Sequence, residues 1–313
     1  MPTAIAYTEF GGPEVLRALE IDEPTPPAGQ LLIRVEAAGV NPIDAKLRSG
    51  ARASAPIEEP RRVGSDGAGV VAGVGDGVDG FRVGDAVVFS GARGAYATHI
   101  SVDATRVHSR PPQASAAQGA ALGIPVGTAY QTLRSLSVGP GDTLLLHAGS
   151  GAVGQAAIQL AVLWGSTVIA TTSDRRADVV RSLGATPVAY GDGLADRVRE
   201  LAPGGVTVAI DAAGTDEALQ TSIALMPDKR RIATLVRGRD ASALGIRAFS
   251  GGSPEPLTPQ QLAWRDEAVP VVLALIAAGR FAVELGPELP LAEAAEAHRL
   301  VERGTDGKIT LIP

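Results

Sequence analysis

The sequence predicts an α/β protein with a doubly wound parallel sheet in its second half and an antiparallel β domain in its first third. Three observations point to this class. Short strand-like and helix-like stretches alternate from residue 143 onward. Glycine and aspartate interrupt β-branched pairs every few residues over 67–90. A glycine motif joins a strand pattern to a helix pattern at 149–154.

Composition narrows the class of protein. The chain has 313 residues, which is enough for two modest domains, and its 45% hydrophobic and 20% charged residues are ordinary for a globular protein. With a net charge of −6 and no basic tract, we expect neither nucleic acid nor an anionic membrane as a partner. The N-terminus lacks the basic start and apolar core of a secretion signal, and no apolar run approaches the ~20 residues of a membrane span. We therefore expect a cytoplasmic protein.

Metal-binding and thiol chemistry have little support in the sequence. There is no cysteine, so disulfides, thiolate nucleophiles and sulfur-ligated zinc are excluded. The four histidines, His99, His108, His147 and His298, are scattered and show no paired metal spacing. We therefore predict no bound metal.

The first third reads as strands separated by turns. Residues 31–40 alternate partly in hydrophobicity and predict a strand. The spacing over 67–90 is typical of a compact antiparallel β-barrel. A further strand within 97–112 stops at a proline pair, and 120–136 has a helical pattern.

The second half alternates strands with helices, as a parallel sheet requires. We predict strands within 143–149, 167–172, 186–191, 206–214, 230–236 and 245–251. We predict helices within 152–165, 174–184, 194–202, 216–226 and 258–280, then a short helix and a final strand within 289–313.

The glycine motif predicts a dinucleotide cradle. Gly149, Gly151 and Gly154 give the spacing G-x-G-x-x-G between a strand and a helix. Gly149 is expected to permit the tight turn, Gly151 to let the backbone approach a pyrophosphate, and Gly154 to let the helix pack closely. Free N–H groups at the helix N-terminus then face the phosphates. A purely structural turn is the alternative. The predicted contacts of the cradle are Gly149, Ser150, Gly151, Ala152, Val153 and Gly154.

The end of the next strand favours NADPH over NADH. The strand ends at Thr172 and Ser173 without an acidic residue, and Arg175 and Arg176 follow Asp174. Hydroxyl and guanidinium donors suit a 2′-phosphate, which a carboxylate would repel. In another register, Asp174 would instead hydrogen-bond a ribose 2′-hydroxyl. The alternative for the two arginines is that they are solvated residues at the start of a helix.

Several long segments resemble one family. Residues 37–50, 64–88, 147–161, 209–214 and 289–313 are similar, in order, to medium-chain dehydrogenases/reductases of the zinc-independent, zeta-crystallin-like quinone oxidoreductase type. The resemblance implies a GroES-like β-barrel catalytic domain at 1–122 and 266–313 and a Rossmann NADP(H)-binding domain at 123–265. It also implies that substrate meets nicotinamide in a cleft between them, and that two chains form a homodimer through their Rossmann sheets.

Zinc alcohol dehydrogenases of the same superfamily are the main rival. They place cysteine where this chain has Asn41, and His-Glu where it has Ser65 and Asp66. Amide, hydroxyl and a single carboxylate bind catalytic zinc poorly, and the cysteine-rich structural zinc lobe is missing. We therefore predict hydride transfer from NADPH to a quinone or an α,β-unsaturated carbonyl without a Lewis acid. A crystallin-like NADPH-binding protein with little turnover is the second hypothesis, and an alcohol dehydrogenase is the third.

Candidate catalytic groups come from 41–48. Asn41 is expected to hydrogen-bond the nicotinamide ribose or the substrate oxygen, and Asp44 is a second polar group in the same apolar turn. Lys46 stands where the resembled enzymes often have a tyrosine, so it is a candidate proton donor, with a solvent-facing side chain as the alternative. Arg48 carries the same alternative.

The resemblance implies further cofactor contacts. It places Thr128 near the pyrophosphate or nicotinamide, with a helix cap as the alternative. It places Lys308 near the cofactor or the cleft, with a surface turn as the alternative. His147 is interpreted as a structural histidine at a strand end. The remaining contacts are Ala213 and Gly214, at the crevice where the strand order reverses, and Phe249, Ser250 and Gly251, near the edge of the nicotinamide.

Overall fold

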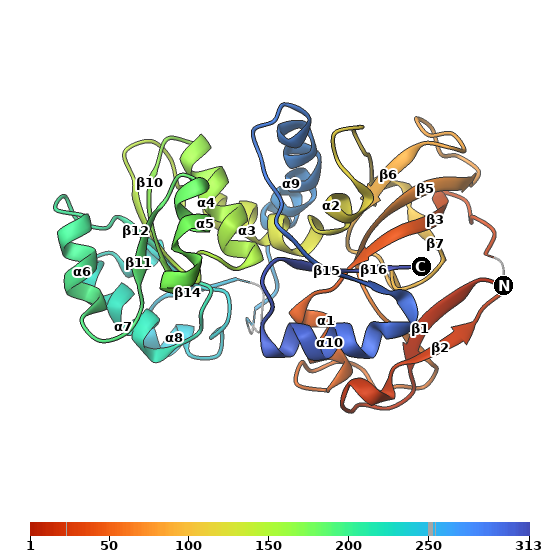
Figure 1. The fold of residues 1–313 in the computed structure, drawn as a ribbon, viewed down its shortest axis with the longest axis horizontal. Coiled ribbons are helices and arrows are strands. Elements are labelled where there is room, and N and C mark those ends of the chain that lie inside the picture. Colours follow the sequence, from red (N-terminus) through yellow and green to blue (C-terminus); the bar gives the residue numbers. More distant parts are fainter. Residues whose placement is uncertain (23, 250–252, 254) are drawn as a thin grey trace. The chain divides into compact units, whose positions relative to one another are not determined.

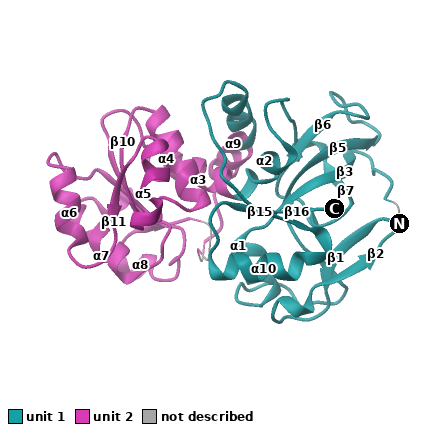
Figure 2. Cartoon of the chain, viewed as in Figure 1, with its two compact units in different colours: residues 1–124, 269–313 teal, residues 125–268 magenta. Residues whose placement is uncertain are grey.

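The computed structural model describes residues 1–22, 24–249, 253 and 255–313 (Figure 1). The chain forms two compact units (Figure 2). Unit 1 contains Met1–Ile124 and Val269–Pro313, and unit 2 contains Pro125–Ala268. Among the described residues, no helix combines the length and the apolar character that crossing a bilayer requires.

Unit 1 is built on two sheets. In the smaller sheet, β1 (Thr3–Tyr7) lies between β2 (Arg17–Glu20) and β4 (Arg61–Arg62). The larger sheet has the order β15-β16-β3-β5-β6-β8, and β7 also pairs with β3. Its pairings are antiparallel except for β15 with β16, so the antiparallel β prediction is confirmed. Its strands are β3 (Gln30–Gly39), β5 (Asp66–Val74), β6 (Ala86–Phe89), β7 (His99–Asp103), β8 (Val107–Ser109), β15 (Leu285–Pro290) and β16 (Lys308–Ile312).

The long strand β3 organises the core of unit 1. It pairs with β5, β7 and β16, so residues far apart in the sequence meet along it. Its buried side chains Leu31, Ile33 and Val35 join Phe89 and Leu311 in one hydrophobic cluster. Helices α1 (Pro42–Arg48) and α10 (Ala294–Arg303) pack against each other, and α2 (Ala116–Ala120) lies against β3 and β5 (Figure 1).

Unit 2 holds a six-stranded parallel sheet in the order β11-β10-β9-β12-β13-β14. Numbered along the sheet this is 3-2-1-4-5-6, the order of dinucleotide-binding doubly wound folds, and it confirms the predicted parallel sheet. The order reverses between β9 and β12, so the loops after these two strands flank the switch point. The strands are β9 (Thr143–His147), β10 (Thr167–Thr172), β11 (Thr186–Ala189), β12 (Val208–Asp211), β13 (Ile232–Thr234) and β14 (Arg247–Ala248).

Helices connect these strands much as the hydrophobic pattern predicts. One difference is that the pattern over 174–184 begins as a 3-10 turn, Asp174–Arg176, before α5. The helices α3 and α9 each cross the boundary between the units. The helices are α3 (Gly123–Ser135), α4 (Ala152–Leu163), α5 (Ala177–Ser182), α6 (Leu194–Leu201), α7 (Asp216–Leu225), α8 (Ala241–Leu244) and α9 (Pro259–Ala277).

Candidate active site and nucleotide loop

The glycine loop in unit 2 is open where a pyrophosphate needs to approach. Gly151 is the N-cap of α4 and supplies no side-chain cap, so the first-turn N–H groups stay available to a ligand. Gly151 and Ala152 are exposed. A Cβ built on Gly151 would have a single neighbour within 4 Å, the Ala148 carbonyl oxygen at 3.5 Å. An uncapped helix N-terminus with open space above it fits an anionic group.

The other two glycines serve close packing. The left-handed residue of the turn is Ala148, with φ 61°, whereas Gly149 lies outside that region, so the turn needs Gly149 because it lacks a side chain and not because of a left-handed backbone. A Cβ on Gly149 would lie 2.6 Å from the Ala170 Cβ, which means that Gly149 lets the loop approach β10. A Cβ on Gly154 would lie 2.3 Å from the Ala148 oxygen, so the close packing predicted for Gly154 is confirmed.

The end of β10 lies beside this loop. Thr171 Oγ1 accepts a hydrogen bond of 3.1 Å from the Ala148 N–H. Thr172 Oγ1 is buried and has no hydrogen-bond partner among the described residues. Other buried hydroxyls share this status, so it is the place of Thr172 at the end of β10, beside the glycine loop, that suits it to a ligand which supplies the missing partner.

The two arginines that follow differ in their surroundings. Arg175 is exposed, and so is Asp174. Arg176 is buried, and its Nη2 donates to the Ser150 carbonyl oxygen at 3.4 Å. The interpretation of Arg176 as a solvated residue is therefore wrong. Ser173 is the N-cap of the 3-10 turn, so Asp174 is not in the capping position.

At the switch point, Asp211 shapes the loop after β12. Its Oδ1 accepts from the N–H groups of Ala213 at 3.0 Å and Gly214 at 2.7 Å. Its Oδ2 accepts from Thr234 Oγ1 at 2.8 Å. Asp211 pairs in register with His147 at the end of β9, so the predicted contacts Ala213 and Gly214 lie at the same sheet edge as the glycine loop.

His147 has a structural role. It is buried, and its Nε2 lies 3.0 Å from Ser222 Oγ. Burial lowers the pKa of His147 to about 4, against the opposing charge of Asp211. A neutral, hydrogen-bonded side chain at a strand end confirms the structural interpretation.

The other predicted cofactor contacts in unit 2 have varied surroundings. Thr128 lies inside α3, so the helix-cap alternative is wrong, and its Oγ1 accepts a 2.9 Å hydrogen bond from Arg265 Nη2. Sequence reasoning missed Arg265, because nothing local links α9 to α3. Phe249 is buried, and its ring centroid lies 4.8 Å from the Arg247 guanidinium carbon. Ser250 and Gly251 lie outside the described residues.

Unit 1 contains a second candidate centre, which we call the polar cluster: Asn41, Asp44, Asp66, Tyr96 and Lys308. Each of these residues is at most 6% exposed. Asn41 precedes α1, Asp66 begins β5, and Lys308 begins β16. The cluster assembles because the last residue of β3, Gly39, pairs with Asp66 on one side and with Thr310 on the other.

Hydrogen bonds connect the polar cluster. Asn41 Nδ2 donates to Asp66 Oδ2 at 2.9 Å, and Lys308 Nζ donates to Asn41 Oδ1. The Asn41 backbone N–H donates to Asp44 Oδ2 at 2.9 Å, and the Tyr96 hydroxyl donates to the same oxygen at 3.0 Å. An ammonium has three N–H donors. Because Asn41 accepts from Lys308 and no second acceptor occurs among the described residues, Lys308 keeps donors for a ligand.

Burial moves two of these groups toward neutral pH. It raises the pKa of Asp44 to about 7, helped by the charge of Asp66 and opposed by the Asn41 and Tyr96 hydrogen bonds and by Lys308. It lowers the pKa of Lys308 to about 8, although Asp66 and Asp44 act in the opposite direction. It also raises the pKa of Tyr96 well above its ordinary value, so the phenol stays a donor. An acid and a base poised near pH 7 suit proton transfer.

The structure shows the surroundings of three residues in unit 1 for which the sequence left alternatives open. Lys308 is buried, so the surface-turn alternative is wrong, and it joins Asn41 rather than the glycine loop. Arg48 is 1% exposed, so the solvent-facing alternative is wrong for it. Lys46 is exposed and lies outside the polar cluster, and its proton-donor role stays a prediction. Sequence reasoning missed Tyr96, because only the tertiary fold brings it to Asp44.

The positions that hold zinc in the rival enzymes are poorly suited to it here. Asp66 Oδ2 accepts from Asn41 Nδ2 at 2.9 Å and from the Ile124 N–H at 2.8 Å, and Ser65 Oγ donates to Asp66 Oδ1 at 3.2 Å. The carboxylate is therefore occupied by donors, and its neighbours are an amide and a hydroxyl. Within the described part of the chain, no group of three or more His, Asp or Glu residues could hold a metal ion.

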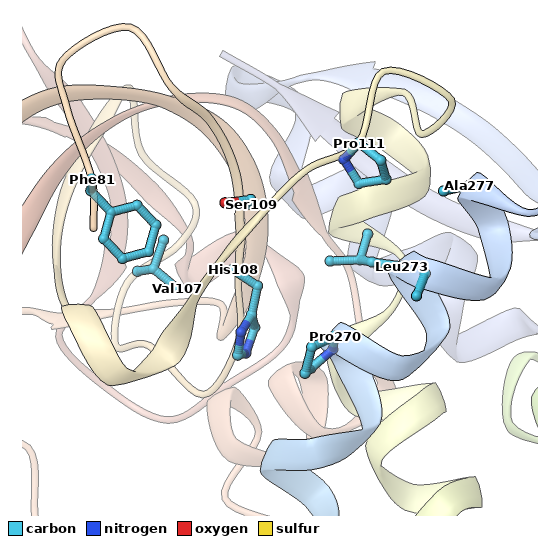
Figure 3. Close-up of a pocket in the computed structure, with 9 residues that line it drawn as sticks. Phe81, Val107, His108, Ser109, Pro111, Pro270, Leu273 and Ala277 are labelled. Carbon is cyan, nitrogen blue, oxygen red and sulfur yellow. The ribbon is translucent and has the colours of Figure 1, made fainter. Parts of the chain in front are cut away.

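Unit 1 also contains a hollow of about 450 Å³ (Figure 3). Apolar side chains of Phe81, Val107 and Leu273 line much of it, together with His108 and Pro270. None of the polar-cluster residues contributes to its lining. Volume alone therefore does not mark the polar cluster, which is a candidate centre because its groups are buried, hydrogen-bonded and titratable.

Models of known protein families match residues in both units. The family model for the alcohol dehydrogenase GroES-like domain matches residues 27–112, and the model for zinc-binding dehydrogenases matches residues 152–244. The human protein "Quinone oxidoreductase" is 32% identical over 332 residues, covering 99% of this chain and 97% of the human one.

Solved structures superpose on this chain over its whole length or nearly so. A mycobacterial protein complexed with NADPH superposes with a TM-score of 0.83 at 32% identity, covering all of both chains. The quinone oxidoreductase of Escherichia coli, also complexed with NADPH, superposes with a TM-score of 0.84 at 28% identity and covers 99% of this chain and 100% of its own.

Proposed function

Because the chain belongs to the quinone oxidoreductase family of the medium-chain dehydrogenases/reductases, we propose that it is an NADPH-dependent oxidoreductase that reduces a quinone or an α,β-unsaturated carbonyl. The observation that carries the proposal is that one chain has both an open glycine loop at the switch point of unit 2 and a buried, titratable polar cluster in unit 1. The two solved relatives that hold NADPH support the choice of cofactor.

The residues of unit 2 fit a phosphorylated dinucleotide. The first turn of α4 would hold the pyrophosphate through its N–H groups, and Gly151 leaves the space for it. Thr172 offers a hydroxyl that has no partner among the described residues, and Arg175 and Arg176 bring positive charge to the end of β10. When bound, the cofactor supplies the hydride.

The polar cluster would supply the proton. Reduction of a quinone by hydride leaves a hydroquinone monoanion, which needs one proton to become neutral. Lys308 is the donor that we assign, because its ammonium has unused N–H groups and its pKa of about 8 keeps it protonated at neutral pH. Asn41 orients the ammonium and is itself fixed by Asp66. We propose that the reaction needs no metal, since hydride acceptors of this class require positioning and proton supply rather than a Lewis acid.

Turnover tests this function directly. The protein, dialysed against a chelator, is expected to oxidise NADPH when a quinone or an enone is added, and absorbance at 340 nm measures the rate. Added zinc is expected to leave the rate unchanged. If NADPH binds and a panel of quinones, enones and enoyl thioesters leaves its oxidation at the background rate, the crystallin-like alternative replaces this proposal. A rate that depends on zinc would instead favour the alcohol dehydrogenase alternative.

Selectivity for NADPH tests the role of the arginines. Replacing Arg175 and Arg176 together by alanine is expected to weaken NADPH binding about 10- to 100-fold, because each charge-assisted hydrogen bond contributes roughly 1.5–3 kcal/mol and the two are not additive. Binding of NADH, which lacks the 2′-phosphate, is expected to change little. Fluorescence titration gives both dissociation constants. Arg181→Ala, on the exposed side of α5, is the matched control. Equal losses for the two cofactors would contradict the assignment.

Two further expectations stay predictions. The predicted homodimer would have its interface on unit 2, where the short strand β14 forms one edge of the parallel sheet. Sedimentation equilibrium of the purified chain measures the oligomeric state. The cytoplasmic location likewise rests on the sequence.

A further inference from the structure

Arg48 is a buried cation in unit 1 that the proposed reaction does not use. It ends α1, the helix that begins beside Asn41 and contains Asp44. Its Nε donates to the Gly11 carbonyl oxygen at 3.1 Å, and its own carbonyl oxygen accepts from the Gly11 N–H at 3.2 Å. Its Nη2 donates to Glu302 Oε1 at 2.6 Å, which supplies the counter-charge. Holding a guanidinium away from water is costly, and here the ion pair with Glu302 and the other hydrogen bonds offset that cost.

The third partner of Arg48 leads back toward the polar cluster. Arg48 Nη1 lies 3.3 Å from His298 Nδ1. A guanidinium only donates, so Nδ1 accepts and the ring proton of His298 sits on Nε2. Burial, followed by the charge of Arg48, lowers the pKa of His298 to about 3, so the ring stays neutral at physiological pH. Arg48 therefore fixes both the tautomer and the orientation of this imidazole.

His298 in turn contacts Tyr96. The two ring centroids lie 5.8 Å apart with the planes at 82°, which is the favourable edge-to-face arrangement. Gly64 also fits closely against this ring, because a Cβ built there would lie 2.3 Å from Tyr96 Cδ1. The Tyr96 hydroxyl donates to Asp44 Oδ2. The contacts thus run from Arg48 through His298 and Tyr96 to Asp44, beginning and ending on α1.

We propose that Arg48 is a positioning residue that holds His298 against the Tyr96 ring and thereby keeps the Tyr96 hydroxyl on the carboxylate of Asp44. The inference rests on the proposed function only in that it assigns Asp44 to the reacting cluster. The sequence left open whether Arg48 faces solvent, and no hydrogen bond or ion pair joins its side chain to Asp44 in the described structure.

The charged groups around Asp44 give the expected direction of the effect. Asp66 from β5 and Lys308 from β16 act on its charge, Asn41 and Tyr96 donate to it, and Arg48 makes no comparable contribution. Losing the Tyr96 hydroxyl removes a donor that stabilises the ionised carboxylate, so the pKa of Asp44 rises. If Arg48 acts through Tyr96, losing Arg48 moves the pKa of Asp44 in the same direction.

The test follows the titration of Asp44 in the full chain. Carboxyl ¹³C shifts of aspartate-labelled protein are recorded against pH, and Asp44→Asn assigns the signal. Tyr96→Phe is expected to raise the pKa of Asp44 by about half a unit to one unit, because a hydrogen bond of about 1 kcal/mol corresponds to roughly 0.7 unit. Arg48→Met and His298→Leu are expected to give a large part of that rise, and Arg48→Lys a smaller part. Arg82→Met, at an exposed arginine of unit 1, is the control and is expected to give none.

Two results would overturn the proposal. One is a lowered melting temperature of Arg48→Met with an unchanged titration of Asp44, since a residue that only stabilises the fold gives that pattern. The other is an unchanged titration in His298→Leu, which also decides the matter if Arg48→Met does not fold. The readout needs neither NADPH nor an acceptor, so it remains informative if the proposed reaction fails. If the protein turns over, the part of the pH profile of kcat/KM that follows the titration of Asp44 is expected to shift to higher pH in Tyr96→Phe, Arg48→Met and His298→Leu.

Discussion

Gly151→Val is expected to abolish measurable NADPH binding while the protein stays folded. Gly151 has φ −76° and ψ 163°, a backbone conformation that valine adopts without strain. Its Cβ position has the Ala148 oxygen as the one neighbour within 4 Å, at 3.5 Å, so the added side chain enters the space left for the pyrophosphate. We expect the dissociation constant for NADPH to rise at least about 100-fold, which corresponds to roughly 2.7 kcal/mol, as measured by fluorescence titration or calorimetry.

The matched control is Gly204→Val. Gly204 also lies in unit 2, has no positive φ, and has nothing within 4 Å of its Cβ position, but it follows α6 rather than β9. The NADPH affinity and the melting temperature of the Gly204→Val protein are expected to stay near those of the unmodified protein. An affinity of Gly151→Val within about threefold of that of Gly204→Val would mean that the loop is only a structural turn.

Lys308→Met is expected to lower kcat for quinone reduction about 100-fold, the lower end of what a positioned general acid contributes. The pH dependence carries the sharper signature. A proton donor works in its protonated form, so activity that depends on Lys308 is present below its pKa of about 8 and is lost as the pH rises through that value. The unmodified enzyme is therefore expected to show an alkaline limb near pH 8 that Lys308→Met lacks. Steady-state rates between about pH 6 and pH 10 measure both effects.

Two variants separate this assignment from its competitors. Lys229→Met, at a lysine of unit 2 that donates to the Leu244 carbonyl oxygen, is expected to leave the profile unchanged. Lys46→Met tests the other candidate donor. If Lys46→Met removes the alkaline limb and Lys308→Met keeps it, then the exposed lysine donates the proton and the assignment of Lys308 is wrong. NADPH binding measured in the same variants shows whether unit 2 is intact.

The parallel sheet of unit 2 was predictable because its signals are local. The apolar run Thr167–Thr172 was predicted as a strand and is β10 with the same bounds. The glycine spacing after β9 marks the point where a strand gives way to a helix, and the backbone there obeys the same steric rules in any such fold. The backbone conformation within the loop was harder to predict. Its left-handed residue is Ala148, and alanine has no strong preference for that conformation.

The sequence by itself determined the alternation of strands and helices in unit 2 and the place of the nucleotide loop, because each of these depends on neighbours within a few residues, and composition alone determined the absence of cysteine ligands. The turn expected at 41–48 is instead the helix α1, from Pro42 to Arg48. The tertiary structure decided which side chains complete the polar cluster. Lys308 lies 267 residues from Asn41, and Tyr96 lies 52 residues from Asp44. Pairing of β16 with β3 and packing of α10 on α1 bury these groups and the Arg48 cation. Burial of these two polar groups, which depends on segments far apart in the sequence, is the main physical cause that moves Asp44 and Lys308 toward neutral pH.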